Sequence, residues 1–186
     1  MLQKIARVII TRRCQRNCSG CCNTYSHIMQ NAVSIDNISA LKGYSIICIT
    51  GGEPLLEPDL TLGVVAKIRR QNPNSLVYLY SALYTERMYD VVDAVDGIHY
   101  SLHKEACAAD MYDFQQFQKL VAWKGYGKSF RLYIDPKVRY PVKIRPWLWK
   151  RVEIKPWLTE EELIAIQPNG LPKGETLFIL ENKESQ

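Results

Sequence analysis

The stretch Ile46-Ile47-Cys48-Ile49-Thr50-Gly51-Gly52-Glu53-Pro54 joins an apolar run to a tight turn. The apolar run predicts a β-strand, and the turn brings two glycines and a carboxylate to its carboxyl end. Glycines let a backbone approach a ligand closely, and Glu53 can accept a hydrogen bond from an ammonium group. Gly-Gly-Glu-Pro alone is an ordinary turn in most proteins, so its meaning depends on what surrounds it.

Strand-like runs and helix-like segments alternate along the chain. The strand candidates are 6–11, 45–50, 76–81, 97–103, 130–135 and 151–157. The helix candidates are 34–42, 59–71, 85–95 and 104–124, with a short turn near 142–149. This order predicts an α/β fold of right-handed βαβ units with a parallel sheet. At ~30 residues per unit the chain holds six units, which favours a partial (β/α)6 barrel; a doubly wound sheet is the alternative.

The chain of 186 residues is one domain, shorter than the ~250 residues of a full eight-unit barrel. We assign residues 1–157 to the partial-barrel core and 158–186 to a C-terminal extension packed on or near it. Residues after Gln167 are expected to form a surface appendage, because Pro168, Gly170, Pro172 and Gly174 follow in quick succession.

Composition predicts a soluble, globular, cytoplasmic protein without a membrane partner. Hydrophobic residues make up 47% and charged residues 23%, and no apolar run approaches the ~18 residues of a membrane span. The first residues are too polar for a secretory signal. Four of the six cysteines lie within nine residues, which in a cytosolic chain indicates metal binding rather than disulfides.

The cysteine cluster follows the first strand as Cys14-Gln-Arg-Asn-Cys18-Ser-Gly-Cys21. Three thiolates in one short loop can hold three irons of a [4Fe-4S] cluster and leave the fourth iron open. A zinc site would need a fourth protein ligand, for which Cys22 and His27 are candidates. The Gly-Gly-Glu-Pro turn one βαβ unit later favours the iron–sulfur cluster. We expect Cys22 to point away from it.

Together, Cys14, Cys18, Cys21 and residues 51–54 resemble the motifs of the radical S-adenosylmethionine (SAM) superfamily, and the six-unit order extends the resemblance over about residues 6–157. The resemblance implies a [4Fe-4S] cluster whose open iron binds SAM, with Gly51, Gly52, Glu53 and Pro54 at the cofactor. It implies an oxidoreductase that reductively cleaves SAM to a 5'-deoxyadenosyl radical, which abstracts hydrogen from a substrate. A flavodoxin or ferredoxin would donate the electron.

One position departs from the superfamily pattern. The residue before the third cysteine is usually aromatic and helps to frame the adenine, whereas here it is Gly20. Adenine binding must therefore depend on the backbone or on later strands. Gly20 together with Asn23 is similar to the cysteine loop of the small activases of anaerobic ribonucleotide reductases.

Side-chain alternation predicts which residues of the later strands face the cavity. Polar residues share one face of three successive strands, and we place them inward: His99, Ser101, His103, Arg131, Tyr133, Asp135, Glu153, Lys155 and Trp157. By position, Ser81 and Ser101 match SAM-contacting residues of the superfamily, and Arg131 is a candidate partner for the SAM carboxylate. The catalytic candidates are His99, His103, Tyr133 and Lys155.

Basic and aromatic residues are interleaved in the segment 124–157. Between 124 and 155 ten side chains are basic and two are acidic. Basic groups neutralise phosphates and aromatic rings stack on bases, so the segment predicts a nucleobase, nucleotide or nucleic-acid substrate. The alternative is an activase that forms a glycyl radical on a protein partner. A more remote alternative is a non-catalytic zinc-binding module.

Overall fold

The computed structural model describes residues 4–168 and 170–181. Within these residues eight strands form one sheet in the order β2-β8-β1-β3-β4-β5-β6-β7, and all neighbouring strands are parallel. The strands are β1 (Ile5–Ile9), β2 (Val33–Ile35), β3 (Ile46–Thr50), β4 (Leu76–Ser81), β5 (Gly97–Leu102), β6 (Ser129–Ile134), β7 (Arg151–Ile154) and β8 (Glu175–Leu180). Because β2 and β7 are the two edges, the sheet is open. The predicted α/β partial barrel is confirmed.

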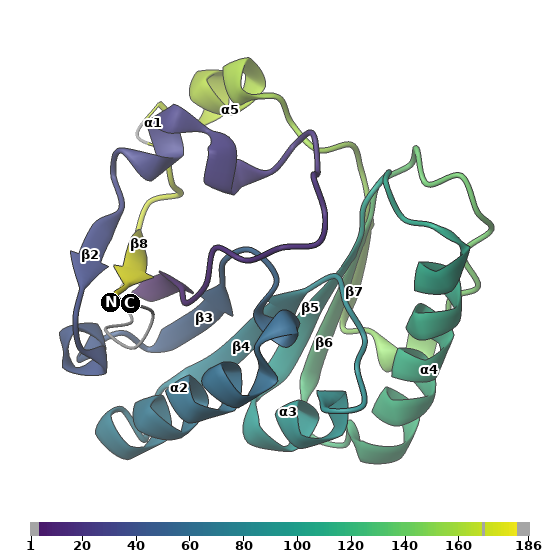
Figure 1. The fold of residues 1–186 in the computed structure, drawn as a ribbon, viewed down its shortest axis with the longest axis horizontal. Coiled ribbons are helices and arrows are strands. Elements are labelled where there is room, and N and C mark those ends of the chain that lie inside the picture. Colours follow the sequence, from purple (N-terminus) through teal and green to yellow (C-terminus); the bar gives the residue numbers. More distant parts are fainter. Residues whose placement is uncertain (1–3, 169, 182–186) are drawn as a thin grey trace.

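The helices lie on opposite sides of this curved sheet. They are α1 (Ser26–Met29), α2 (Pro58–Gln71), α3 (Met88–Ala94), α4 (Ala108–Lys124) and α5 (Glu160–Ile166), with 3-10 turns η1 (Cys22–Thr24), η2 (Ile38–Leu41), η3 (Pro54–Leu56) and η4 (Pro146–Leu148). Figure 1 shows α2, α3 and α4 along the outer side, and α1 and α5 close together across the opening. Among the described residues no helix is long and apolar enough to cross a membrane.

The core fills the space between the sheet and its outer helices. Each central strand turns alternate side chains outward, and these are almost fully buried: Ala6, Val8, Ile10, Ile47, Ile49, Val77, Leu79, Ile98, Tyr100, Leu102, Phe130, Leu132 and Ile134. Phe117 of α4 stacks on Tyr100 from the helix side, and the Phe114 ring packs on it at a tilt. Because this face is apolar, the opposite face of the same strands is left for polar residues.

Two sequence predictions are wrong at one edge of the sheet. Residues 34–42 do not form a helix: they contain the end of β2 and the turn η2, which Asn37 caps by accepting from the Ser39 amide at 2.9 Å. Residues after Gln167 do not form a mere surface appendage, because β8 pairs with both β1 and β2. Leu177 and Phe178 are buried there, which stabilises the added strand. The domain boundary after residue 157 stays a prediction.

Candidate active site

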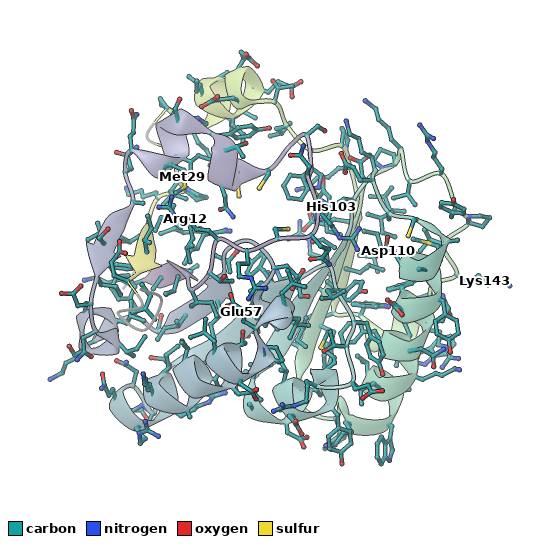
Figure 2. The ribbon with its side chains drawn as sticks, in the orientation of Figure 1. Arg12, Met29, Glu57, His103, Asp110 and Lys143 are labelled. Atoms are coloured by element: carbon teal, nitrogen blue, oxygen red, sulfur yellow. The ribbon has the colours of Figure 1, made fainter. Side chains whose placement is uncertain are left out.

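A cavity of about 710 Å³ lies on the polar face of the sheet, toward the carboxyl ends of the strands. It is lined by residues of six strands and their following loops, among them Cys14, Cys18, Cys21, Cys22, Gly51, Gly52, Glu53, Ser81, His99, Ser101, His103, Arg131, Tyr133, Lys155 and Trp157. In Figure 2, Arg12 lies in the opening between the sheet and α1, and His103 lies on the far side of the loop that follows β1. Parallel α/β folds bind ligands at this edge of the sheet because the loops converge there.

The cysteine loop forms one part of the cavity wall. Cys14 is exposed, Cys18 and Cys21 are half-buried, and none of the three is in a disulfide. The loop turns tightly, because the amide of Cys21 donates to the carbonyl of Cys18 at 3.2 Å. The amide of Arg16 donates to the Cys14 sulfur at 3.4 Å, a contact that stabilises a thiolate.

The donor set of this loop consists of thiols, which suit an iron–sulfur cluster. Cys14, Cys18 and Cys21 are free and line one cavity, whereas His27, a candidate fourth zinc ligand, is buried and does not line it. Cys22, the other candidate fourth zinc ligand, also lines the cavity; that it points away from the cluster stays a prediction. In the described part of the chain, no three His, Cys, Asp or Glu side chains are arranged so that they could hold a metal ion. The three thiols must therefore turn toward a common centre to bind a cluster.

The Gly-Gly-Glu turn is joined to the chain that precedes the cysteine loop. The Gly52 amide donates to the Thr11 carbonyl at 2.8 Å, and the Glu53 amide donates to the Arg13 carbonyl at 2.7 Å. A Cβ on Gly52 would lie 2.1 Å from the Arg13 oxygen, and Gly51 has a φ of +143°. Both positions therefore need glycine. Asn23, after the third cysteine, donates to the Gly51 carbonyl, which ties the loop and the turn together.

Glu53 is buried beneath the turn and already has partners. Its Oε1 accepts from the Ser81 hydroxyl at 2.8 Å and the Leu55 amide at 3.1 Å, and its Oε2 accepts from the Ala82 amide at 2.8 Å. Burial raises the pKa of Glu53 while these donors oppose the rise. A carboxylate has about four acceptor positions, so roughly one remains for a ligand. Ser81 lines the cavity as well as donating to Glu53, and its contact with SAM stays a prediction.

The alternation prediction is correct for every residue except Asp135, which does not line the cavity: it is buried after β6, where its carboxylate accepts from the Lys137 amide. Of the predicted site residues, all of which the structure describes, only Pro54 is absent from the cavity wall, because it is buried at the start of η3. Register places Tyr80 beside His99, and His99 beside Arg131. Among the described residues no carboxylate pairs with Arg131, so its guanidinium is available to a ligand. The catalytic and cofactor roles assigned to these residues stay predictions.

The two cavity histidines are neutral near pH 7. Burial, with Arg131 and Arg7 nearby, lowers the pKa of His99 to about 4. Burial, with Arg16 nearby, lowers the pKa of His103 to about 4. A neutral imidazole can both accept and donate a proton, which suits it to orient a polar substrate.

The polar ends of the other two catalytic candidates are engaged. The Tyr133 hydroxyl donates to the Lys155 carbonyl at 2.6 Å, and the Lys155 ammonium lies 2.6 Å from Glu153. Burial raises the pKa of Tyr133 to about 12, so it is a neutral phenol. Both groups must exchange a partner before they can act on a substrate.

The sequence did not reveal the residue that anchors the cysteine loop. Arg16 reaches from this loop to the Ala82 carbonyl at 3.0 Å and makes a two-pronged ion pair with Asp110 at the start of α4. The side chains are 10% and 12% exposed. No local pattern connects residues 94 positions apart. Arg7 was also missed, although the alternation used for the later strands would place it inward.

An aromatic side chain lies beside Gly20. A Cβ at residue 20 would be 2.9 Å from the Cβ of Trp157. Trp157 also packs on His103, with ring centroids 4.6 Å apart, and on Tyr133 at 5.7 Å. Its indole nitrogen is buried without a hydrogen-bond partner in the described residues. A ligand with an acceptor atom would satisfy this donor.

Residues 5–105 match the family of 4Fe-4S single cluster domains. The chain belongs to this family. The matched residues include the three cysteines, the Gly-Gly-Glu turn and the strands between them. As a 4Fe-4S single cluster domain, the protein uses a [4Fe-4S] cluster, for which Cys14, Cys18 and Cys21 are the predicted ligands.

Comparisons of this 4Fe-4S domain with curated proteins and with solved structures give no match or only a distant one. No curated protein matches its sequence. Among solved structures it is similar to BtrN, crystallised in complex with AdoMet and 2-DOIA, with a TM-score of 0.47 and 15% sequence identity. The match covers 84% of this chain and 57% of BtrN, so the chain spans little more than half the length of that protein.

Proposed function

We propose that the protein is a radical SAM enzyme. The observation that carries the proposal is the meeting of two motifs at one cavity: the three-cysteine loop and the Gly51–Glu53 turn. The turn is hydrogen-bonded to residues 11–13, directly before the loop, so a ligand on the cluster would contact the turn as well. The bound cluster and SAM together would supply one-electron cleavage of SAM and a carbon radical for hydrogen abstraction.

The chain's own residues would bind and orient SAM. Glu53 has about one acceptor position left for the SAM ammonium group. Arg131, which has no ion-pair partner among the residues that the structure describes, offers its guanidinium to the SAM carboxylate. Trp157 offers a buried indole donor next to Gly20, where the superfamily usually has an aromatic residue. The cavity of about 710 Å³ is within the usual range of small-molecule sites, about 300–1,000 Å³.

The proposed substrate is a nucleobase, nucleotide or nucleic acid. Polar side chains from three adjacent strands line the cavity, which suits a hydrogen-bonding substrate rather than an apolar one. The alternative is an activase that forms a glycyl radical on a protein partner. A flavodoxin or ferredoxin would supply the electron in either case.

Anaerobic reconstitution tests the proposal. Protein loaded with iron and sulfide and then reduced with dithionite should convert SAM to 5'-deoxyadenosine, which chromatography measures. The Cys14→Ser, Cys18→Ser and Cys21→Ser variants should each lose the cluster absorption and the product. Stoichiometric zinc without acid-labile sulfide would favour the zinc-module alternative. Cluster-loaded, reduced protein that never forms deoxyadenosine would refute radical SAM activity.

A further inference from the structure

The fold divides the basic segment 124–157 into separate groups. Lys128 donates to the carbonyls of Asp93 and Val95 at 3.1 and 2.7 Å, and Lys124 forms an ion pair with Asp93. Lys124 ends α4 and Lys128 directly precedes β6, so both precede the amino end of that strand, opposite the end that carries the cavity. The segment is therefore not one continuous phosphate-binding surface, and only the part that adjoins the cavity can serve a substrate there.

One group surrounds a second hollow, of about 500 Å³, next to the carboxyl ends of β5 and β6. It lies between the loop after β5 and the loop after β6. The residues that line it are Lys104, Glu105, Ala106, Cys107, Lys137, Arg139 and Tyr140. Three cations thus face one carboxylate, and in the described residues no carboxylate forms an ion pair with Lys137 or Arg139.

The single carboxylate of the hollow is largely engaged elsewhere. Glu105 accepts from the Ser19 amide at 3.2 Å and from the Ser19 hydroxyl at 3.3 Å, whereas Lys104 lies 3.9 Å away. These bonds connect the wall of the hollow to the cysteine loop of the active site. The hollow therefore has excess positive charge and adjoins the cavity.

The loop that carries the two unpaired cations is held in place. The buried Asp135 accepts from the Lys137 amide at 2.8 Å, and its carbonyl accepts from the Val138 amide at 3.0 Å. The 17-residue helix α4 begins at the same hollow, after Cys107. The positive end of the helix dipole adds to the potential of the cations, although Asp110 offsets part of it.

We propose that this hollow binds a phosphate group of the substrate while the rest of the substrate enters the cavity. Lys104 and His103 are consecutive, and His103 lies on the cavity wall, so one ligand can contact both places. Guanidinium and ammonium groups bind phosphate by charge-assisted hydrogen bonds, and Tyr140 adds a ring at the rim. The inference rests on the proposed function, because it names the substrate class of the same site.

A matched pair of double variants tests the proposal. Lys137→Gln/Arg139→Gln removes two cations from the hollow, and Lys143→Gln/Arg145→Gln removes the same two residue types from the same segment. Figure 2 shows Lys143 at the outer edge beside α4, away from His103. Calorimetry on the cluster-loaded protein would compare uridine 5'-monophosphate, uridine and a short single-stranded DNA.

The first double variant should weaken binding of the monophosphate by about tenfold or more, and the second by less than about twofold. Uridine should be insensitive to both. If the oligonucleotide loses affinity and the monophosphate does not, the phosphate belongs to a nucleic-acid backbone, and the slope of log affinity against log salt should fall by about 0.7 per lost contact. Equal effects of the two variants, or no binding of either phosphate probe at low salt, would overturn the proposal.

A parallel measurement of SAM cleavage separates this inference from the proposed function. Deoxyadenosine formation without phosphate binding would refute only the proposal that the hollow binds phosphate. Phosphate binding without deoxyadenosine formation would refute radical SAM activity and leave the hollow as a binding site.

Discussion

Removal of the Asp110 carboxylate should destabilise the protein far more than an ordinary surface substitution. Asp110 and Arg16 are nearly buried, and both Asp110 oxygens accept from the guanidinium. The same carboxylate accepts from the Cys107 amide at 2.7 Å and so caps α4. Loss of one partner of a buried ion pair costs about 3–5 kcal/mol, and loss of a cap adds about 1 kcal/mol. For the isosteric Asp110→Asn, which keeps one acceptor, we expect a loss of about 2–4 kcal/mol.

Urea unfolding under anaerobic, reducing conditions measures this loss. Asp113→Asn is the matched control, since it makes the same change one turn later on α4 and should cost less than about 0.5 kcal/mol. In a double-mutant cycle, Arg16→Met/Asp110→Asn should cost much less than the sum of the single variants, because neither charge is left buried alone. Additive single effects, or a loss below 1 kcal/mol for Asp110→Asn, would refute the buried-pair argument.

The Arg16–Asp110 ion pair should also affect how firmly the cluster is held. Because Arg16 lies between two of the predicted ligands, release of its side chain should loosen the cysteine loop while α4 stays folded. Reconstituted Asp110→Asn should therefore lose iron faster than the parent at unchanged helix content. Iron retention equal to that of Asp113→Asn would show that the ion pair does not position the loop.

Three further changes test separate parts of the site. Gly52→Ala should destabilise the protein by about 1–3 kcal/mol and impair iron loading, because a Cβ would meet the Arg13 carbonyl. Gly63→Ala in α2, where a Cβ has open space, is the control and should stabilise the protein by up to about 1 kcal/mol. Denaturation and iron analysis would measure both variants. Burial lowers the pKa of His99 to about 4, so between about pH 6.5 and 4 this histidine is protonated in the unfolded chain but not in the folded one. As the pH falls through this window, the parent should therefore lose up to about 3 kcal/mol of folding stability, and His99→Gln should lose less. Cys22→Ala should keep the cluster, and iron loss equal to that of a ligand variant would show that the ligand assignment is wrong.

The sequence predicts the parts of this fold that depend on local periodicity. All six predicted strands exist: five of them have alternate side chains in the apolar core, and β7 is a mostly exposed edge strand. The inward positions of His99 and Arg131 follow from alternation once the outer face is known to be apolar. The ladder beside β1 was not predicted, because β8 pairs with a strand about 170 positions earlier and only long-range packing decides that partner.

The glycines of the turn illustrate a partial success. The sequence predicts that Gly51 and Gly52 permit a close approach of backbone. The structure adds that the approaching group is the protein's own chain at Thr11 and Arg13. Sequence spacing cannot distinguish a ligand from a neighbouring strand, because either one excludes a Cβ in the same way.

The departure at Gly20 is explained by a contact between distant parts of the chain. An aromatic residue at position 20 would collide with Trp157, whose Cβ already lies 2.9 Å from the place of a Cβ on Gly20. The segment that carries Trp157 leads directly to α5: the Leu158 carbonyl, just before the helix, accepts from the Tyr25 hydroxyl at 3.0 Å, and Glu160 at its start binds His27. These bonds join the C-terminal segment to α1 just after the cysteine loop. The aromatic surface beside the third cysteine is therefore supplied from the other end of the chain, and only a glycine at position 20 leaves room for it.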